Sequence, residues 1–236
     1  APTIVEYGTP EQIQTYLRPM FTTEEIWCQL FSEPGSGSDL ASLSTKAIDD
    51  GDGYIVNGQK VWTTLGHLAK WGLIVTRTDP SVPKHRGLTF FIVDMESDGV
   101  DVRPLRQITG EAEFNEVYFT DVKIPKENIL GSLGEGWRVS LAILMNERVA
   151  IGGNVRERGS GAPGHLVQLW KENELEDPVS RDKLIKLWIE QEAVRLTNVR
   201  AFENREKGTP GPEGSTSKLY EAEINKASYE FGMEML

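Results

Sequence analysis

The sequence predicts an α+β, multi-domain chain in which a short helical start is followed by a middle β-domain and then by a helical bundle. Two observations carry this prediction. Short apolar runs separated by turn dipeptides fill residues 21–133, whereas apolar residues recur at helical spacing from about residue 134. Composition agrees, because 39% hydrophobic and 26% charged residues over 236 positions are typical of a folded, soluble chain.

Residues 1–20 are predicted to be the end of a helical domain. Thr9 is a capping residue, Pro10 is tolerated in the first turn, and the acid Glu11 complements the positive end of the helix dipole. We expect this helix to end at Pro19. Because one short helix cannot bury its own apolar face, either it packs against the next part or the chain begins within a domain.

The middle part, residues 21–133, is predicted to be β-structure. Its strand-like runs are IWCQLF, STKAID, YIVNGQKVWTT, WGLIVTRT, LTFFIVDM, VDVRPL and EVYFTDVKIP. The pair Asn57-Gly58 is the strongest signal for a hairpin, because both residues tolerate a positive φ. About seven short strands at regular spacing predict a sandwich or a barrel.

The last part, residues 134–236, is predicted to be helical. Trp137 and Leu141 begin a helical repeat, and a long amphipathic helix is expected from Asp177 to Gly208. A third helix, KLYEAEINKASYEFGMEML, follows a turn rich in glycine and proline. We expect the bundle to be incomplete, because this helix reaches Leu236 on apolar residues without a C-terminal cap.

Charge and composition disfavour several classes of protein. A net charge of −11 disfavours a general nucleic-acid binder, and no apolar run approaches the roughly 20 residues of a membrane span. The single cysteine, Cys28, cannot form an intrachain disulfide, which favours a cytoplasmic location. The histidines, His67, His85 and His165, lack metal-ligand spacing, so no metal site is predicted.

A loop of glycine and serine, FSEPGSGSD, follows the first strand-like run. Gly35 and Gly37 allow a ligand to approach the backbone, while Ser36 and Ser38 add hydroxyl donors. The loop matches neither G-x-G-x-x-G nor the phosphate-binding P-loop. It is either a ligand-binding loop or a simple connector.

Trp62 ends the strand-like run KVWTT and is followed by Thr63 and Thr64. A tryptophan can cover the face of an aromatic ligand while a neighbouring hydroxyl bonds to its edge. The alternative is a tryptophan of the core beside β-branched strand residues. Either interpretation fits these three residues.

Asn146-Glu147-Arg148 interrupts an otherwise apolar helix. A carboxylate on such a face must be paired, protonated or functional. Arg148 would then orient Glu147 or bind an anion. The alternative is a surface pair or a salt bridge between helices.

Together, these stretches resemble the acyl-CoA dehydrogenase family over nearly the whole chain. FSEPGSGSD is similar to the family's T-E-P-G-x-G-S-D flavin loop, and YIVNGQKVWTT to its N-G-x-K-x-W-I-T-N strand pair. The resemblance implies an N-terminal helical domain, a middle β-domain and a C-terminal four-helix bundle. Here we expect the N-terminal domain to be nearly absent and the bundle to lack its final part. It also implies FAD as cofactor and a homotetramer or heterotetramer.

The implied reaction is the dehydrogenation of an acyl-CoA thioester to the trans-2-enoyl-CoA, with an electron-transfer flavoprotein as electron acceptor. By the resemblance, Phe31 and Ser32 lie beside the flavin ring, and Gly37 and Ser38 near the flavin side chain and the substrate. Trp62 lies against the flavin and Thr64 bonds near its N5 atom. Thr63, which replaces an apolar residue of the family pattern, is placed with them among the cofactor-binding residues.

Glu147 is the expected catalytic base, because MNERVAIGG resembles the minority of members, such as isovaleryl-CoA and long-chain dehydrogenases, that carry the base on the first bundle helix. Arg148 matches the neighbouring arginine near the substrate. The segment RERGSGAPG departs from the family's R-x-F-G pattern, which binds the FAD adenylate. The sequence therefore does not identify the residues that would bind the adenylate here. The segments FNEV and GPEGSTSKLYEAE resemble those of actinobacterial members, some of which act on sterol side-chain thioesters.

Two other functions remain open from the sequence. The chain would be an acyl-CoA oxidase or a flavin monooxygenase relative if its electrons passed to oxygen. It would be a catalytically silent partner subunit if its role were structural within a heterotetramer. The flavin loop, the Trp62 segment and Glu147 occurring together favour the dehydrogenase.

Overall fold

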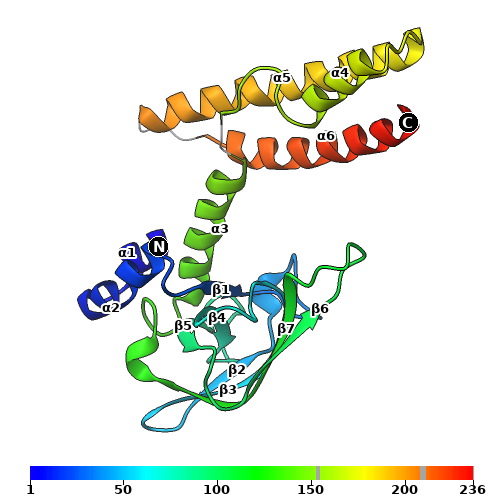
Figure 1. Cartoon of the computed structure of the whole chain (residues 1–236). Helices are drawn as coiled ribbons and strands as arrows, with labels where there is room; N and C mark the ends of the chain where they lie inside the picture. The colour runs from blue at the N-terminus through cyan, green and yellow to red at the C-terminus, as the bar shows by residue number, and fades with distance from the viewer. Residues whose placement is uncertain (153–154, 208–210, 236) are drawn as a thin grey trace. The chain divides into compact units, whose positions relative to one another are not determined.

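The chain divides into two units by its internal contacts, Ala1–Ile143 and Leu144–Leu236, and each unit has a hydrophobic core of its own. The computed structural model (Figure 1) describes residues 1–152, 155–207 and 211–235. The boundary between the units falls inside helix α3 (Gly136–Gly152). The three-part division at residues 20 and 133 stays a prediction.

The first unit contains two N-terminal helices, a sheet and the start of α3. Its elements are α1 (Pro2–Tyr7), α2 (Pro10–Phe21), β1 (Trp27–Leu30), η1 (Leu40–Ser42), β2 (Lys46–Asp49), β3 (Gly53–Thr64), β4 (Trp71–Arg77), β5 (Leu88–Asp94), β6 (Val100–Leu105), β7 (Phe114–Pro125) and η2 (Lys126–Asn128). The seven strands form one curled, mixed sheet in the order β1-β4-β2-β3-β7-β6, with β5 paired to β4. The predicted β-domain is therefore a half-barrel with helices against it.

Helix α2 begins where its sequence predicts. The Thr9 hydroxyl accepts from the Gln12 amide at 3.2 Å and the Gln12 side chain accepts from the Thr9 amide at 3.1 Å, a complete capping box. The helix ends at Phe21 rather than at Pro19, because a proline in the last turn removes one hydrogen bond without stopping the chain. Gln12 also donates to the Glu127 carbonyl at 2.7 Å, so α2 packs against the β-domain.

The predicted hairpin at Asn57-Gly58 is wrong. Strand β3 runs through both residues, and the chain turns earlier, at Gly51, which has a φ of 103°. The Asn57-Gly58 pair lies at an irregularity instead, where the register with β7 shifts between Val56 and Gly58. A Cβ at Gly58 would lie 2.7 Å from the Thr45 Cα, so the close approach of two backbones explains the glycine.

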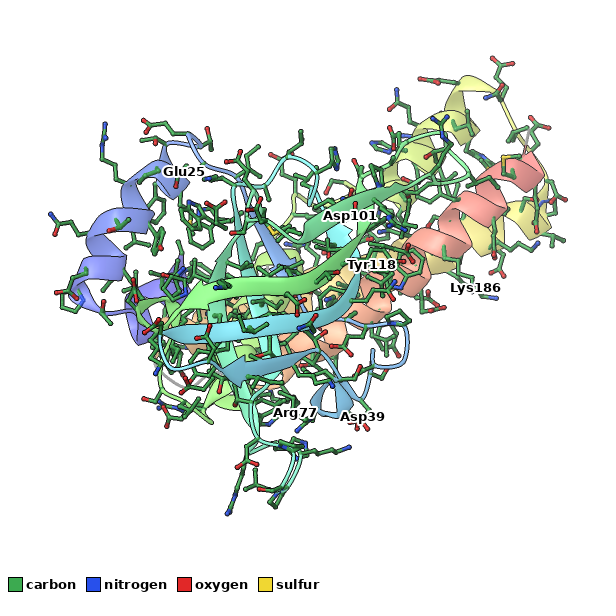
Figure 2. The ribbon with its side chains drawn as sticks, turned by 90° about the horizontal axis from the view of Figure 1, so that it is seen from below. Glu25, Asp39, Arg77, Asp101, Tyr118 and Lys186 are labelled. Atoms are coloured by element: carbon green, nitrogen blue, oxygen red, sulfur yellow. The ribbon has the colours of Figure 1, made fainter. Side chains whose placement is uncertain are left out.

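The sheet is apolar inside and charged along its outer edge. Its buried core residues are Cys28, Leu30, Ala47, Tyr54, Val56, Ala69, Ile74, Phe91, Val93, Met95, Val117, Phe119, Val122 and Ile124. At the edge, Asp101 of β6 lies opposite Tyr118 of β7 (Figure 2), and the Arg103 guanidinium lies 4.5 Å from the centre of the Tyr118 ring. Such charged edges oppose pairing with other strands.

The second unit consists of the end of α3 and three further helices. These are α4 (Ala162–Glu172), α5 (Pro178–Glu206) and α6 (Glu213–Met235). Asp177 caps α5 by accepting from the Ser180 amide at 2.7 Å, as its sequence suggests. Leu166, Leu184 and Phe231 join α4, α5 and α6 in one apolar cluster. Among the described helices, none combines the length and the apolar character needed to cross a membrane.

Candidate functional site

The glycine-serine loop, residues 31–39, is a folded turn. The Glu33 amide donates to the Ser36 carbonyl at 2.9 Å, and the Ser36 amide donates to the Glu33 carbonyl at 3.0 Å. The Ser36 hydroxyl donates to the Asp39 carbonyl at 2.7 Å. Phe31 is buried at the start of the loop. A Cβ at Gly35 or at Gly37 would meet nothing within 4 Å. The outer side of this turn is therefore open backbone, as a ligand-binding loop requires.

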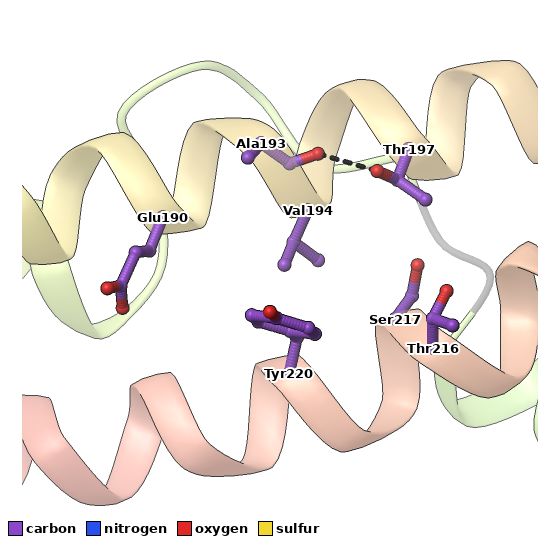
Figure 3. Close-up of a pocket in the computed structure, with 7 residues that line it drawn as sticks. All are labelled: Glu190, Ala193, Val194, Thr197, Thr216, Ser217 and Tyr220. Atoms are coloured by element: carbon purple, nitrogen blue, oxygen red, sulfur yellow. Dashed lines mark hydrogen bonds between the residues drawn. The ribbon is translucent and has the colours of Figure 1, made fainter.

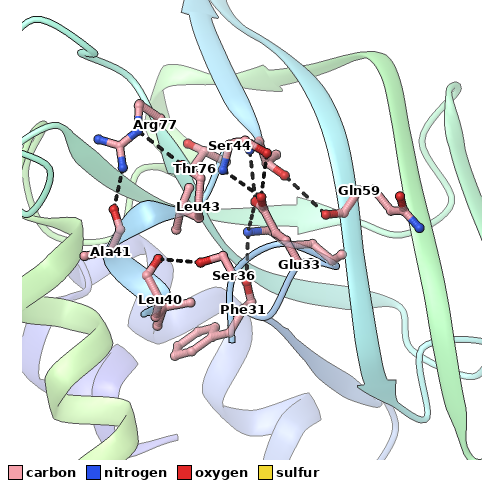
Figure 4. Close-up of polar contacts among 12 residues, drawn as sticks. Phe31, Glu33, Ser36, Leu40, Ala41, Leu43, Ser44, Gln59, Thr76 and Arg77 are labelled. Atoms are coloured by element: carbon pink, nitrogen blue, oxygen red, sulfur yellow. Dashed lines mark hydrogen bonds and ion pairs between the residues drawn. The ribbon is translucent and has the colours of Figure 1, made fainter. Parts of the chain in front are cut away.

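A buried ion pair anchors the loop to strand β3, and Figure 4 shows the polar contacts around its carboxylate, Glu33. The Lys60 ammonium donates to a Glu33 carboxylate oxygen at 2.9 Å and to the Phe31 carbonyl at 3.0 Å. Glu33 also accepts from the amides of Ser44 and Thr45, at 2.6 and 2.9 Å. Three segments that are distant in sequence thus converge on one carboxylate.

Burial and mutual attraction shift the pKa values of both groups. Burial acts to raise the pKa of Glu33, but the charge of Lys60 and hydrogen bonds from Thr45, Ser44 and Lys60 together lower it to about 2. Burial lowers the pKa of Lys60 to about 8, against the opposing effect of the Glu33 carboxylate. The pair is therefore charged at neutral pH.

Trp62 protrudes from the end of β3 on a strained backbone. Its φ is 62° and 63% of its surface is exposed. A register shift between Lys60 and Thr63 creates the irregularity that turns it outward. The Trp62 ring meets the Phe114 ring edge-on, with centroids 6.2 Å apart. A tryptophan of the core would be buried, so that alternative does not describe this residue.

The two threonines after Trp62 differ in exposure. Thr64 is exposed, whereas Thr63 is 1% exposed and its hydroxyl has no hydrogen-bond partner. The Thr63 hydroxyl is thus inside the sheet rather than on the surface that carries Thr64. Direct contact of Thr63 with a cofactor stays a prediction, and its burial does not support it.

Asn115 is a residue of this region that sequence reasoning missed. It is fully buried on β7, and its side-chain amide donates to the carbonyls of Thr63 at 2.9 Å and Glu113 at 3.1 Å. Its amide oxygen lies 3.2 Å from Nδ1 of His67. A polar residue at an inward position of the run FNEVYF was the available signal.

The loop and the Trp62 segment lie side by side. The Val61 amide donates to the Ser32 carbonyl at 2.9 Å, one residue before Trp62. Two of the three predicted motifs are therefore adjacent in the first unit. Their exposed parts offer a flat apolar ring, the hydroxyls of Thr64 and Ser38, and open glycine backbone. This combination suits a flat, polar-edged aromatic ligand.

Glu147 belongs to the second unit. Its carboxylate lies 2.9 Å from the Lys218 ammonium of α6, and about a third of the Glu147 side chain (33%) is exposed. The structure thus contains the interhelical salt bridge that the sequence left open as an alternative. The side chain of Arg148 lies outside the described residues.

The second unit also has a hollow between α5 and α6 (Figure 3). Its volume is about 230 Å³. Val194 lies across it from the ring of Tyr220, and the buried Ser217 hydroxyl at its margin has no hydrogen-bond partner. The predicted site residues do not line it. Among the described residues, no group of histidine, cysteine and acidic side chains is arranged to hold a metal ion.

Family models match most of the chain. Residues 28–122 match the middle domain of acyl-CoA dehydrogenase, and residues 134–236 match its C-terminal domain. Acyl-CoA dehydrogenase FadE34 of Mycobacterium tuberculosis is 43% identical over 241 residues, which cover 100% of this chain and 33% of FadE34.

Two solved structures are similar in fold. The ChsE4-ChsE5 complex of Mycobacterium tuberculosis has a TM-score of 0.84 at 31% identity, covering 99% of this chain and 61% of the matched one. The Tcur3481-Tcur3483 steroid acyl-CoA dehydrogenase has a TM-score of 0.85 at 28% identity, covering 98% and 60%. The chain thus spans between a third and three fifths of the length of these relatives. Two family models in the expected order, over a half-barrel and its helices, place the chain in the acyl-CoA dehydrogenase family.

Proposed function

We propose that this chain carries the flavin-facing surface of an FAD-dependent acyl-CoA dehydrogenase, which removes hydrogen across the α and β carbons of an acyl-CoA thioester. The observation that carries the proposal is Trp62, a tryptophan held outward on a left-handed backbone directly beside an open glycine loop. Strain of this kind is retained where function requires it. Membership of the family supplies the reaction class.

The exposed residues of the loop and of the Trp62 segment fit a flavin. The Trp62 ring offers a flat face, and the Thr64 hydroxyl can bond to a ring edge. Gly37 and Ser38 leave backbone and a hydroxyl exposed for the side chain of the cofactor and for the thioester. Phe31 and Ser32 are proposed to lie beside the flavin ring, since they begin the loop and the Ser32 carbonyl accepts from the Val61 amide at 2.9 Å, next to Trp62. When bound, FAD supplies the acceptor for the hydride of the β-carbon.

Glu147 is proposed to take the α-proton of the thioester. A carboxylate from which bound substrate excludes water is a stronger base than one in solution. The ammonium of Lys218 now bonds to this carboxylate at 2.9 Å, so proton abstraction requires Glu147 to turn away from Lys218 or to use its other oxygen. Arg148, next in sequence, is proposed to lie near the substrate.

A catalytically silent subunit is the second candidate function. The observation that favours it is the same Glu147–Lys218 ion pair, which engages the predicted base. A silent subunit would bind FAD or hold a partner chain without reacting with acyl-CoA. The exposed Trp62 surface argues against a subunit that binds no flavin, because such a subunit has no use for a strained tryptophan at a ligand loop. Reduction of the bound flavin by acyl-CoA separates the dehydrogenase from a silent subunit that binds FAD.

Substrate and partners are proposed from the relatives. One structural neighbour is named a steroid acyl-CoA dehydrogenase, and both neighbours are complexes of two different chains. We propose a bulky acyl-CoA, such as a sterol side-chain thioester, as substrate, and an assembly with a second chain or further copies. An electron-transfer flavoprotein is the proposed electron acceptor.

The test of the flavin surface is a titration of FAD into the protein. The Trp62→Ala substitution should weaken FAD binding about fivefold or more, because one stacked aromatic face is worth about 1 kcal/mol or more. Phe21→Ala is the matched control, since Phe21 is a similarly exposed aromatic (70%) of the same unit but lies at the end of α2. Equal FAD affinity in the wild type and Trp62→Ala would refute the assignment.

A further inference from the structure

Lys60 and Glu33 form a charged pair inside the β-domain for which the proposed reaction has no direct use. The Lys60 side chain is 0% exposed and that of Glu33 is 4% exposed. Neither group can therefore touch FAD or a thioester. A buried pair of this kind contributes little net stability compared with apolar residues of the same size. Its presence calls for a reason other than stability.

The pair lies where the two ligand-facing motifs meet. Lys60 precedes Trp62 by two residues, and Glu33 follows Phe31 by two. The Lys60 ammonium bonds to both the Phe31 carbonyl and the Glu33 carboxylate, at 3.0 and 2.9 Å. One side chain of β3 thus holds the loop at its first residue and at its turn.

Glu33 is fixed from the other side as well. The amide and the hydroxyl of Ser44 donate to it at 2.6 and 2.8 Å, and the Thr45 amide donates at 2.9 Å. These donors precede strand β2, so the carboxylate links the loop to two strands of the sheet. With Lys60 included, four charge-assisted hydrogen bonds converge on the carboxylate, which fixes its position in three dimensions.

We propose that Lys60 and Glu33 are positioning residues that lock the glycine-serine loop against β3 and thereby set the surface that receives FAD; this inference rests on the function proposed above. The loop is rich in glycine and serine and would otherwise sample many conformations. Holding it in place removes an ordering cost from FAD binding. The same anchor fixes β3 directly before the irregularity that turns Trp62 outward.

The test is a neutral replacement of the pair, Glu33→Gln with Lys60→Met, in the whole chain. This double variant removes both charges at similar side-chain volume, so we expect it to fold. A single Lys60→Met variant would leave the Glu33 carboxylate buried without a partner and risks not folding. The matched control is Asp49→Asn with Lys126→Met. Lys126 also bonds to a carboxylate and a carbonyl, those of Asp49 and Gly51, but this pair is exposed and lies at the far turn of the β2–β3 hairpin.

Two readouts separate positioning from mere support of the fold. In protein without added FAD, amide hydrogen exchange at residues 32–38 and 61–64 should rise about tenfold in the double variant and stay unchanged in the control. The dissociation constant for FAD should rise by a similar factor while the thermal midpoint changes little. Restoring Lys60 alone, which leaves the single Glu33→Gln variant, should rescue neither readout, because the ammonium then lacks its carboxylate partner.

Unchanged loop exchange in a folded double variant would overturn the inference. So would increased exchange spread over the whole sheet, since that would indicate a general loss of stability. If the wild type fails to bind FAD, the proposed function falls, but the exchange measurement still decides whether the pair holds the loop. The two failures are therefore distinguishable.

Discussion

At the scale of single residues, the side chains proposed to matter for function lie in environments that are unusual for their residue types. Trp62 is apolar but exposed, and its backbone is left-handed. Lys60 is charged but fully buried. Glu147 interrupts an apolar helix and is paired. Sequence reasoning singled out Trp62 and Glu147 but passed over Lys60, because its partner Glu33 lies 27 positions away and no spacing rule connects them.

A single substitution tests the proposed role of Glu147 as the catalytic base. Glu147→Gln keeps the size of the side chain and removes its basicity. We expect this variant to bind FAD as the wild type does but to lose flavin reduction by acyl-CoA by on the order of 10²-fold or more, which is typical of losing a general base. Rapid-mixing absorbance of the bound flavin measures both.

Lys218→Gln is the matched control for this prediction, because it breaks the same ion pair from the other side. It should leave the base in place and retain most of the reduction rate. If Glu147→Gln and Lys218→Gln lower the rate equally, the ion pair matters only to the packing of α3 on α6. If neither lowers it, Glu147 is not the base.

At the scale of elements, periodicity predicted most of the architecture. The switch from alternating runs to helical spacing marks the strands and the long helices α5 and α6. It failed where tertiary contacts decide. Asn57-Gly58 has the local chemistry of a turn, but β3 continues through both residues between β2 and β7, so the glycine serves a close approach to Thr45 instead. Helix α4 was not predicted, because it follows a glycine-rich stretch and its N-cap, Gly161, makes no side-chain capping bond.

The loop anchor also has a consequence for stability in acid. The pKa of Glu33 falls from 4.5 to about 2 on folding, so its contribution is fully present above pH 4.5 and is lost as the pH falls from there through about 2. A shift of this size corresponds to about 3 kcal/mol. The free energy of unfolding of wild type should therefore exceed that of Glu33→Gln at pH 7, and the difference should shrink by pH 3.

Denaturant titrations at the two pH values measure this difference. Asp49→Asn serves as the control, because Asp49 pairs with Lys126 at the surface and such pairs contribute little. Its effect should be small at both pH values. A gap between wild type and Glu33→Gln that stays constant from pH 7 to pH 3 would mean that Glu33 is not held ionised by the anchor.

At the scale of the whole molecule, the order of the two matched domains and the curled sheet agree with the family that the sequence motifs suggested. The motifs were recoverable from sequence because each is contiguous. The contacts of Glu147 with Lys218, and of Thr63 with Asn115, were not, because they join residues 71 and 52 positions apart. Such pairs depend on the packing of elements, which local patterns do not specify.

The measurement that tests the central claim most directly is the visible absorption of the purified, FAD-loaded protein under anaerobic conditions, before and after addition of acyl-CoA thioesters. The panel should contain straight-chain, branched and sterol side-chain acyl groups, with free coenzyme A as control. We predict that the flavin band bleaches with at least one thioester, most strongly with a bulky one, and not with free coenzyme A. A bound flavin that no thioester of the panel reduces would contradict the dehydrogenase and support a silent subunit.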